Sequence, residues 1–505
     1  MRRGSAGLAG SGADATLLAI VVLGAALRVW GLTRQGVWYD ESVTAWLMRG
    51  TPGQMLATLP HSESTPPLYY LLAWGWTHVF GDSAAGLRSL SCLAGIAAVP
   101  VSYLAARAMT STRAARWTAL IVAVNPLLVW YSQEARAYSL LVLGAGLSLW
   151  ATAAVRAIPG PRRLALWVLA ATVVVATHYF GLFLVIGEAA LVLSSGGVAQ
   201  RWRAGAVAVV AACSAGLLSL AATQRTRHYY FLDIPLSHRV QGVAHDFLVG
   251  FSPPATRLPA AAALGAAGVA LGALVWRRRS QPGTTAPALA LAGALGIPLA
   301  LALAGLDYVN SRNVIAAVVP LAILLGAGLG TLPRRLGLGA GVVLAAVSVW
   351  TTASLAGDPG AQRPPWQRVA TALGSLPRTA AIVLDGSSTW AGPLNFYLPH
   401  LWFADRGGAR VREIAVLHRL RSHAGCGRPT WWGPECSEHA RPLPAAPAPG
   451  FRFVARREVG DFEIATYVAG RPVRVYPRMP FDRPAGRTAG RRHLMIATVS
   501  RPLPG

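Results

Sequence analysis

The sequence contains no lysine, so all 46 of its basic side chains are arginines. Charged residues make up 13% of its 505 residues, against about 25% in a typical soluble domain, whereas hydrophobic residues make up 53%. This scarcity of charge argues against an ordinary soluble protein and predicts a polytopic membrane protein in contact with the lipid bilayer. The net charge of +26 does not indicate a nucleic-acid partner, because many arginines lie in short loops beside apolar segments, where they fix topology.

The sequence also lacks the usual motifs of nucleotide and hydrolase chemistry. It has no P-loop, no glycine fingerprint for a nucleotide, and no HExxH or GxSxG motif in a convincing context. We therefore expect no nucleotide cofactor. Cysteine is scarce, with four residues. Cys92 and Cys213 lie in apolar segments, whereas Cys426 and Cys436 lie near each other in a polar region, where we expect a disulfide; two free thiols are the alternative.

About eleven apolar segments are long enough to cross a membrane. They lie at residues 14–32, 86–108, 115–131, 136–155, 163–179, 180–196, 204–222, 258–276, 285–305, 313–332 and 336–355. Arginines precede the first segment and follow every even-numbered one, as Arg107, Arg156, Arg201, Arg277 and Arg334 illustrate. Because positive residues gather in cytoplasmic loops, the pattern predicts a multi-pass protein of the cell membrane with a cytoplasmic N-terminus. Arg28 interrupts the first segment, and we expect its side chain to extend to the interface.

Two regions are predicted to lie on the extracytoplasmic side. In the loop 33–85, residues 41–48 and 66–76 are expected to form short helices along the membrane surface, with an extra span at 66–76 as the alternative. After the membrane module, residues 1–355, a soluble α/β domain is predicted over 356–470, with a helix at 364–373 and strands at 380–386, 451–456 and 462–468. Residues 471–505, rich in arginine and proline, are expected to form a poorly ordered tail.

Two acidic motifs lie on this side. Asp40 and Glu41 follow the first apolar segment, and Glu134 lies between the third and fourth. Ionisable groups at a membrane boundary are costly, so they indicate chemistry. Adjacent side chains diverge on a helix, so we expect one of Asp40 and Glu41 to face a cavity and the other to brace a helix. Asp40 could act as a general base, or hold a divalent metal with Glu134; an N-cap role is its alternative.

Other candidate residues on the same side carry cationic, acidic and aromatic side chains. Four arginines suit bidentate binding of phosphate, with anchoring to lipid headgroups as the alternative for each: Arg136, Arg225, Arg227 and Arg312. His178 and Tyr179 lie at a predicted tight turn, and His61 and Glu63 precede a diproline. These residues could contact a sugar or a metal, and ordinary interfacial residues are the alternative.

These motifs, taken in order, resemble the GT-C glycosyltransferases that use polyprenyl-phosphate sugars, specifically the group similar to glycosyltransferase family 39. That group includes protein O-mannosyltransferases and aminoarabinose transferases. The resemblance covers about the first 200 residues and rests on these runs: Trp38–Glu41, Glu63–Tyr70, Leu87–Ser91, Tyr131–Tyr138 and His178–Gly181.

The resemblance implies an inverting transfer of a sugar, mannose or another, from a polyprenyl-phosphate donor on the extracytoplasmic face. It matches Asp40, the general base, and Glu41 to the acidic motif of the first outer loop, and Glu134 to that of the second. Tyr69, which lies in one of the matching runs, is a further candidate for contact with the substrate. Family members often bind a divalent metal, but no clear ligand set is visible here. The acceptor, whether lipid, glycan or protein, stays open.

A different class of function stays open beside the enzyme. A flippase or transporter of lipid-linked sugars would show inverted repeats, broken helices and polar residues at mid-membrane. Few charges lie inside the predicted spans, Glu188 being the main exception, and the acidic residues gather instead at the outer boundary. The sequence therefore favours the glycosyltransferase.

Overall fold

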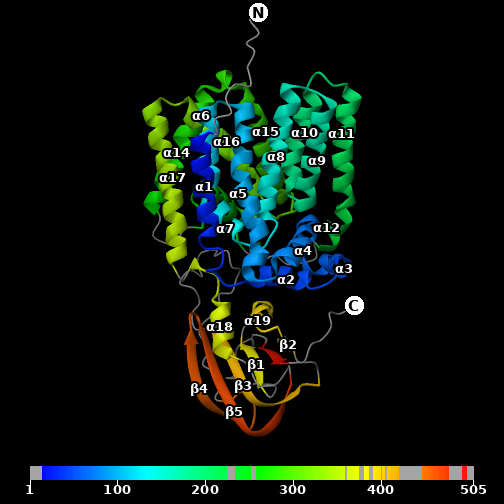
Figure 1. Cartoon of the computed structure of the whole chain (residues 1–505), viewed down its shortest axis with the longest axis vertical. Coiled ribbons are helices and arrows are strands. Elements are labelled where there is room, and N and C mark those ends of the chain that lie inside the picture. Colours follow the sequence, from blue (N-terminus) through cyan, green and yellow to red (C-terminus); the bar gives the residue numbers. More distant parts are fainter. Residues whose placement is uncertain are drawn as a thin grey trace, which may run out of the picture.

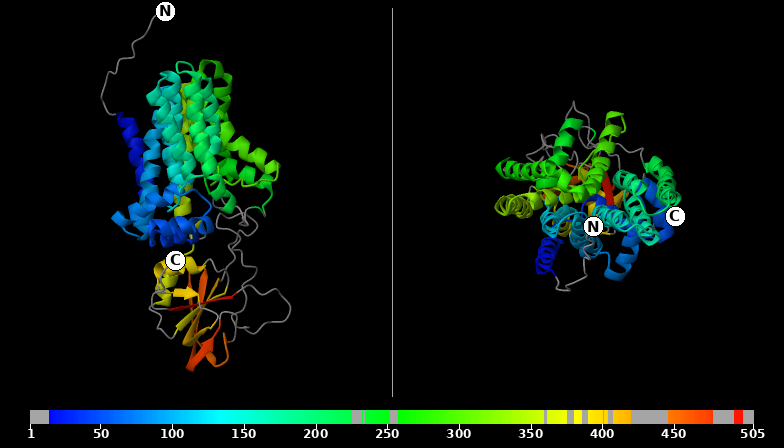
Figure 2. Two further views of the ribbon diagram at one scale, coloured as in Figure 1. Left: turned by 90° about the vertical axis from the view of Figure 1, so that its right-hand side faces the viewer. Right: turned by 90° about the horizontal axis from the view of Figure 1, so that it is seen from above.

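The computed structural model describes residues 14–224, 232, 234–251, 257–358, 361–374, 380–385, 390–399, 401–403, 407–419, 446–476 and 492–497. It consists of a helical bundle with an α/β domain at one end (Figure 1). The same stacking is visible from the side in Figure 2. The predicted Cys426–Cys436 disulfide and the candidates Arg225 and Arg227 lie outside the described residues.

The first half of the bundle contains twelve described helices: α1 (Ala15–Val29), α2 (Tyr39–Met48), α3 (Pro52–Ser62), α4 (Leu68–Phe80), α5 (Ala84–Met109), α6 (Thr112–Val124), α7 (Pro126–Ser132), α8 (Tyr138–Ala157), α9 (Pro161–Thr177), α10 (Gly181–Ser194), α11 (Gln200–Gly216) and α12 (Leu218–Gln224). The second half contains α13 (Leu236–Val249), α14 (Arg257–Trp276), η2 (Arg278–Ser280), η3 (Pro282–Thr284), α15 (Thr285–Leu303), η4 (Ile315–Ala317), α16 (Val318–Thr331) and α17 (Arg334–Gly357).

Six described helical segments are long and apolar enough to cross a membrane, or seven if the bent pair α6–α7 is counted as one span. Three shorter apolar helices, residues 15–29, 181–194 and 315–331, lie among them. Each of the eleven predicted segments is helical, but the count of eleven spans is not confirmed by length and composition. A helical membrane protein is confirmed.

The break between α6 and α7 explains why Arg28 is buried, whereas its sequence position predicts a side chain at the membrane interface. Pro126 has no N–H, so it cannot donate to the carbonyl of Val122, and the chain bends by 55°. Arg28 is fully buried instead of reaching the interface. Its guanidinium donates to the carbonyl oxygens of Val122 at 3.0 Å and Ala123 at 2.7 Å. The arginine thus replaces donors that the break removes.

Three short helices cover the end of the bundle that faces the α/β domain (Figure 1). The predicted helices at 41–48 and 66–76 correspond to α2 and α4. Helix α3 was not predicted; it begins with Pro52 after a capping box between Thr51 and Gln54. Helix α4 begins directly after Pro67. We call the end of the bundle that is covered by α2, α3 and α4 the domain-side end.

The α/β domain contains one mixed sheet and two helices. Its elements are α18 (Trp366–Leu373), β1 (Ala380–Asp385), α19 (Ala391–Tyr397), β2 (Leu401–Phe403), β3 (Ala409–Arg419), β4 (Phe451–Val459), β5 (Phe462–Val475) and β6 (Arg492–Ala497). The strand order is β2-β6-β1-β3-β5-β4, with β1 and β3 parallel and every other pairing antiparallel. Because β5 and β6 include residues beyond 470, the sheet extends into the segment predicted as a tail.

The sheet packs on α18 and α19 through one of its faces, where Trp366, Trp390 and Phe462 form an aromatic cluster. Helix α19 in turn contacts α2. A Cβ atom on Gly392 would lie 2.4 Å from the hydroxyl of Ser42, so a larger residue here would force the Ser42 side chain to move. The hydroxyl of Tyr397 accepts a hydrogen bond from Val37 N–H at 2.9 Å. The α/β domain therefore rests directly on the helix that carries the first acidic motif.

Candidate active site

Helix α2 holds two adjacent carboxylates in its first turn. Asp40 and Glu41 follow Trp38, the N-cap residue, so their charges lie at the helix end that favours negative groups. Their side chains diverge, as neighbouring positions on a helix do. The side chain of Glu41 is 1% exposed, whereas that of Asp40 is 21% exposed. The pair therefore provides one interior carboxylate and one accessible carboxylate.

The carboxylate of Glu41 is bound from several directions. Arg88 donates to both of its oxygens, each at 2.6 Å, and Arg363 donates to Oε2 at 2.9 Å. The N–H of Ala135 donates to Oε1 at 3.0 Å. Burial alone would raise the pKa of Glu41, but the charges of the two arginines outweigh it and hold the pKa below its ordinary value. Glu41 is therefore ionised, and it connects α2, α5 and the loop after α7.

Glu134 lies next to Glu41, across a shared arginine. Arg363 donates to its Oε2 at 2.7 Å, and Oε1 has no hydrogen-bond partner among the described residues. Burial raises the pKa of Glu134 to about 7, although the charge of Arg363 opposes the shift. The guanidinium of Arg363 also packs over Trp38 and Trp130, with its central carbon 5.6 Å and 5.2 Å from the ring centres. One buried cation thus joins two buried carboxylates.

The accessible carboxylate faces a second arginine. Asp40 Oδ2 lies 3.4 Å from a guanidinium nitrogen of Arg312, whose side chain is 16% exposed. Arg136 lies below, where it donates to the backbone oxygen of Asp40 at 3.4 Å and to Glu63 Oε1 at 2.8 Å. The Asp40–Arg312 contact is long for a charge-assisted hydrogen bond, so it is weak.

Helix α13 holds the loop that carries Arg312. Arg239 forms an ion pair with Asp307 and donates to the carbonyl of Val309 at 2.7 Å. In the same loop, Ser311 donates to Asp246 of α13. Arg312 therefore reaches Asp40 from an anchored loop, although the two residues are far apart in the sequence.

The structure places the other predicted residues at different depths. His178 is buried, its Nδ1 accepts from Phe180 N–H at 3.2 Å, and burial lowers its pKa to about 3, helped by the charges of Arg312 and Arg136. Tyr69 is fully buried, with its hydroxyl 3.2 Å from that of Ser91.

Two predicted residues lie near α3. The hydroxyl of Tyr179 donates to Gln224 at 2.9 Å, and the Gln224 amide donates to the Leu59 carbonyl of α3 at 3.3 Å. His61 is exposed in the last turn of α3. Of the predicted residues, Arg136 and Arg312 thus contact Asp40 directly. Glu63 is linked to Asp40 through Arg136.

Two residues at the centre of this site were not predicted to have a role there. Arg88 lies in the second turn of α5, and a charge inside an apolar segment was the available signal. Arg363 lies 322 positions after Glu41 in the chain, immediately before a diproline. The residues around Arg363 indicate only the start of a helix, so no local sequence pattern predicts that Arg363 binds Glu41 and Glu134.

The described side chains do not fit a divalent metal. Among them, no group of three or more His, Cys, Asp or Glu residues could hold one. The two candidate ligands also face guanidinium groups, Asp40 facing Arg312 and Glu134 facing Arg363. A metal ion bound here would be repelled by these guanidinium groups or would have to displace them. We therefore derive no step through a metal.

The chain is similar to known proteins in part of its sequence and in its fold. Residues 64–222 match the family model described as dolichyl-phosphate-mannose-protein mannosyltransferase. The structure is similar to ArnT from Cupriavidus metallidurans in the apo state, with a TM-score of 0.56, 14% identity, and coverage of 90% of this chain and 98% of ArnT. ArnT bound to undecaprenyl phosphate gives a TM-score of 0.55 and 13% identity, with coverage of 91% and 98%. A search of curated protein sequences finds no match.

The chain has the GT-C fold. The likeness to ArnT extends over nearly the full length of both chains. The matched family model is one of glycosyltransferases, and its segment runs from the residues before α4 to α12. The predicted fold is confirmed, and the prediction of a membrane glycosyltransferase agrees with both comparisons.

Proposed function

We propose that the chain transfers a sugar from a polyprenyl-phosphate donor to an acceptor hydroxyl at the domain-side end, with Asp40 as the general base. The single observation that carries the proposal is the contrast between three acidic residues. Asp40 is partly exposed and lies 3.4 Å from Arg312, whereas Glu41 and Glu134 are buried against Arg363. The undecaprenyl phosphate bound by ArnT supports the class of donor.

The proposed reaction is a single displacement. The acceptor oxygen attacks the anomeric carbon as its proton passes to the Asp40 carboxylate, and the bond between that carbon and the phosphate oxygen breaks. Attack opposite the leaving group inverts the configuration at the anomeric carbon. Asp40 suits the base because its side chain is accessible and its contact with Arg312 is weak enough to be exchanged for a substrate.

Arginines suit the phosphate that leaves. The departing polyprenyl phosphate gains negative charge, which a guanidinium placed in advance stabilises. Arg312 is the first candidate because its side chain is partly exposed and lies next to Asp40. Arg136 adds positive charge below the site but is already paired with Glu63, so we assign it a supporting role.

Glu41 and Glu134 act through the groups that they hold. The oxygens of Glu41 already accept hydrogen bonds from two arginines and from a backbone N–H, so it fixes the start of α2. Glu134 binds the same Arg363 and lies in the loop that contacts α2. His178, with its pKa lowered by burial, is neutral at pH 7 and can donate or accept a hydrogen bond without adding charge.

The test is Asp40→Asn in the purified full-length chain. Sugar transfer is measured with a panel of radiolabelled polyprenyl-phosphate sugars and a membrane extract that supplies acceptors. Removing a general base should lower the rate about 10²–10⁴-fold. Asp82→Asn is the matched control, because Asp82 is a 63% exposed carboxylate that only reaches Arg49 at 3.9 Å.

The outcomes separate the competing functions. Transfer that falls in Asp40→Asn and persists in Asp82→Asn supports the proposal. Unchanged transfer in Asp40→Asn removes this residue from the mechanism. Movement of the lipid-linked sugar across vesicle membranes, without transfer by the wild-type chain, would favour a flippase.

A further inference from the structure

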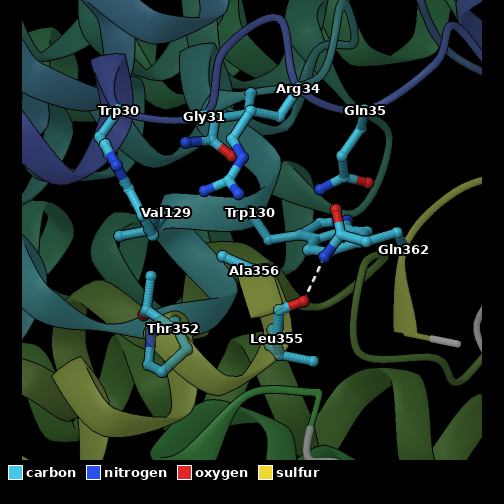
Figure 3. A pocket seen from close by; sticks show the side chains of 12 residues that line it. Trp30, Gly31, Arg34, Gln35, Val129, Trp130, Thr352, Leu355, Ala356 and Gln362 are labelled. Atoms are coloured by element: carbon cyan, nitrogen blue, oxygen red, sulfur yellow. Dashed lines mark hydrogen bonds between the residues drawn. The ribbon is translucent and has the colours of Figure 1, made fainter. Parts of the chain in front are cut away.

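A pocket outside the candidate active site is lined on one side by Trp130. It comprises about 410 Å³ of space, including open solvent, between the end of α1, α7 and the end of α17. Figure 3 shows Arg34 and Gln35 entering from the loop after α1, Gln362 entering from the chain after α17, and Trp130 between them. Leu355 and Val129 supply apolar walls.

The polar groups of this pocket suit an anion. Arg34 is exposed, its guanidinium lies 5.1 Å from the ring centre of Trp30, and it has no ion pair among the described residues. Gln35 uses its Oε1 to accept from the Arg363 N–H at 3.4 Å, which leaves its NH₂ group without an acceptor among the same residues. The described lining contains no carboxylate. The pocket is therefore lined by the Arg34 guanidinium and the Gln35 amide donor, and its described lining has no negative side chain that would pair with them.

The position of the pocket favours a lipid as the source of that anion. Helix α1 exposes Leu18 and Val22, each 59% exposed, and Val29, 58% exposed. Helix α17 exposes Val342 at 53% and Trp350 at 42%. Trp30, 49% exposed, lies at the pocket itself, as is typical of tryptophan at a membrane interface. Apolar helix faces thus lead to a pocket with a cation at its mouth.

We propose that this pocket binds the phosphate headgroup of an anionic lipid, whose chains lie along the exposed faces of α1 and α17. It is a separate site from that of Asp40, because the described contacts of Asp40 are with Thr44, Arg136 and Arg312, none of which lines the pocket. Trp130 lines the pocket and also packs against the Arg363 guanidinium, and Gln35 binds the Arg363 backbone. The inference does not depend on sugar transfer, so either proposal can fail without the other.

The test measures lipid binding to the purified full-length chain by native mass spectrometry, with dioleoyl phosphatidic acid as the probe. We expect Arg34→Gln to weaken binding about tenfold, the loss typical of a single charge-assisted hydrogen bond. Arg49→Gln, which removes another partly exposed arginine of the domain-side end, is the control and should bind as the wild type does. Ala356→Phe, which fills the pocket without changing its charge, should weaken binding as much as Arg34→Gln.

Competing ligands distinguish the possible sources of phosphate. Inorganic phosphate and glycerol 3-phosphate, at the concentration of the lipid, should not displace phosphatidic acid, and phosphatidylcholine should bind more weakly. Displacement by either soluble anion at that concentration would overturn the assignment to a lipid. Wild-type affinity in both Arg34→Gln and Ala356→Phe would overturn the site itself.

Discussion

Replacing Arg363 by methionine tests how strongly this residue, which lies between α17 and α18, stabilises the buried carboxylates Glu41 and Glu134. In the wild type this guanidinium lies 2.9 Å from Glu41 Oε2 and 2.7 Å from Glu134 Oε2, and all three side chains are 1% exposed. Methionine is shorter, apolar and uncharged. Glu41 would keep Arg88, whereas Glu134 would keep no hydrogen-bond partner among the described residues.

The expected cost follows from the geometry. At an effective dielectric constant of about 20, each contact at this distance contributes about 6 kcal/mol of attraction before desolvation is subtracted. Removing one partner of a buried ion pair costs about 3–5 kcal/mol, because the other charge stays buried and uncompensated. Glu134 can escape part of this cost by binding a proton, since burial already raises its pKa to about 7. The loss of stability in Arg363→Met should therefore be larger at pH 8 than at pH 6.

The assay is a double-mutant cycle on thermal unfolding in detergent, followed by tryptophan fluorescence at both pH values. The cycle compares wild type, Arg363→Met, Glu134→Gln and the double variant. The double variant should be more stable than Arg363→Met, because it no longer buries an unpaired charge. Arg368→Met, which removes an exposed arginine of α18, is the control. An unfolding midpoint in Arg363→Met equal to that of the wild type, with no rescue by Glu134→Gln, would refute the reasoning.

Two further predictions concern Glu134 and the metal. The pKa of Glu134 rises from 4.5 to about 7 on folding, so the native state holds the proton of this carboxyl more tightly than the unfolded state does. The contribution of this proton to the free energy of unfolding is therefore complete below pH 4.5. It is lost, by about 3 kcal/mol, as the pH rises through 7. Glu134→Gln should flatten the pH dependence of the unfolding midpoint between pH 5 and 8, and an unchanged slope would contradict the assignment. Separately, because Arg312 and Arg363 face the candidate ligands, EDTA should leave sugar transfer unchanged; activity lost to EDTA and restored by Mg²⁺ or Mn²⁺ would show that a metal binds after all.

Much of the fold could be predicted because the membrane restricts the choices. Apolar length and arginine position identified segments that are all helical, and alternating strands identified β4 and β5. The errors occur where a tertiary contact overrides a local pattern. Arg28 looked like an interfacial arginine, but it binds carbonyls that the proline break on another helix leaves without donors. Strand β6 lies in a segment rich in arginine and proline, and its partners β1 and β2 define it as a strand.

The site was predictable in its parts but not in its connections. Adjacent helical positions predict that Asp40 and Glu41 diverge, and the structure gives one accessible and one buried side chain. No local pattern indicates which of them is buried, because that depends on Arg88 and Arg363. Both arginines lie on elements distant in the sequence, and both bind Glu41.

The position of Arg363 joins the α/β domain to the chemistry. Residues 361–374 lead from α17 into that domain, and their arginine is the cation that Glu41 and Glu134 share. Helix α19 of the same domain packs on α2, next to the Asp40 turn. A shift of the domain relative to the bundle would therefore strain two contacts at once, one on the buried carboxylates and one on the helix that aims Asp40. Since buried ion pairs tolerate little displacement, the α/β domain and the acidic site should move as one unit, and an acceptor that binds the domain would be held at a fixed position relative to Asp40.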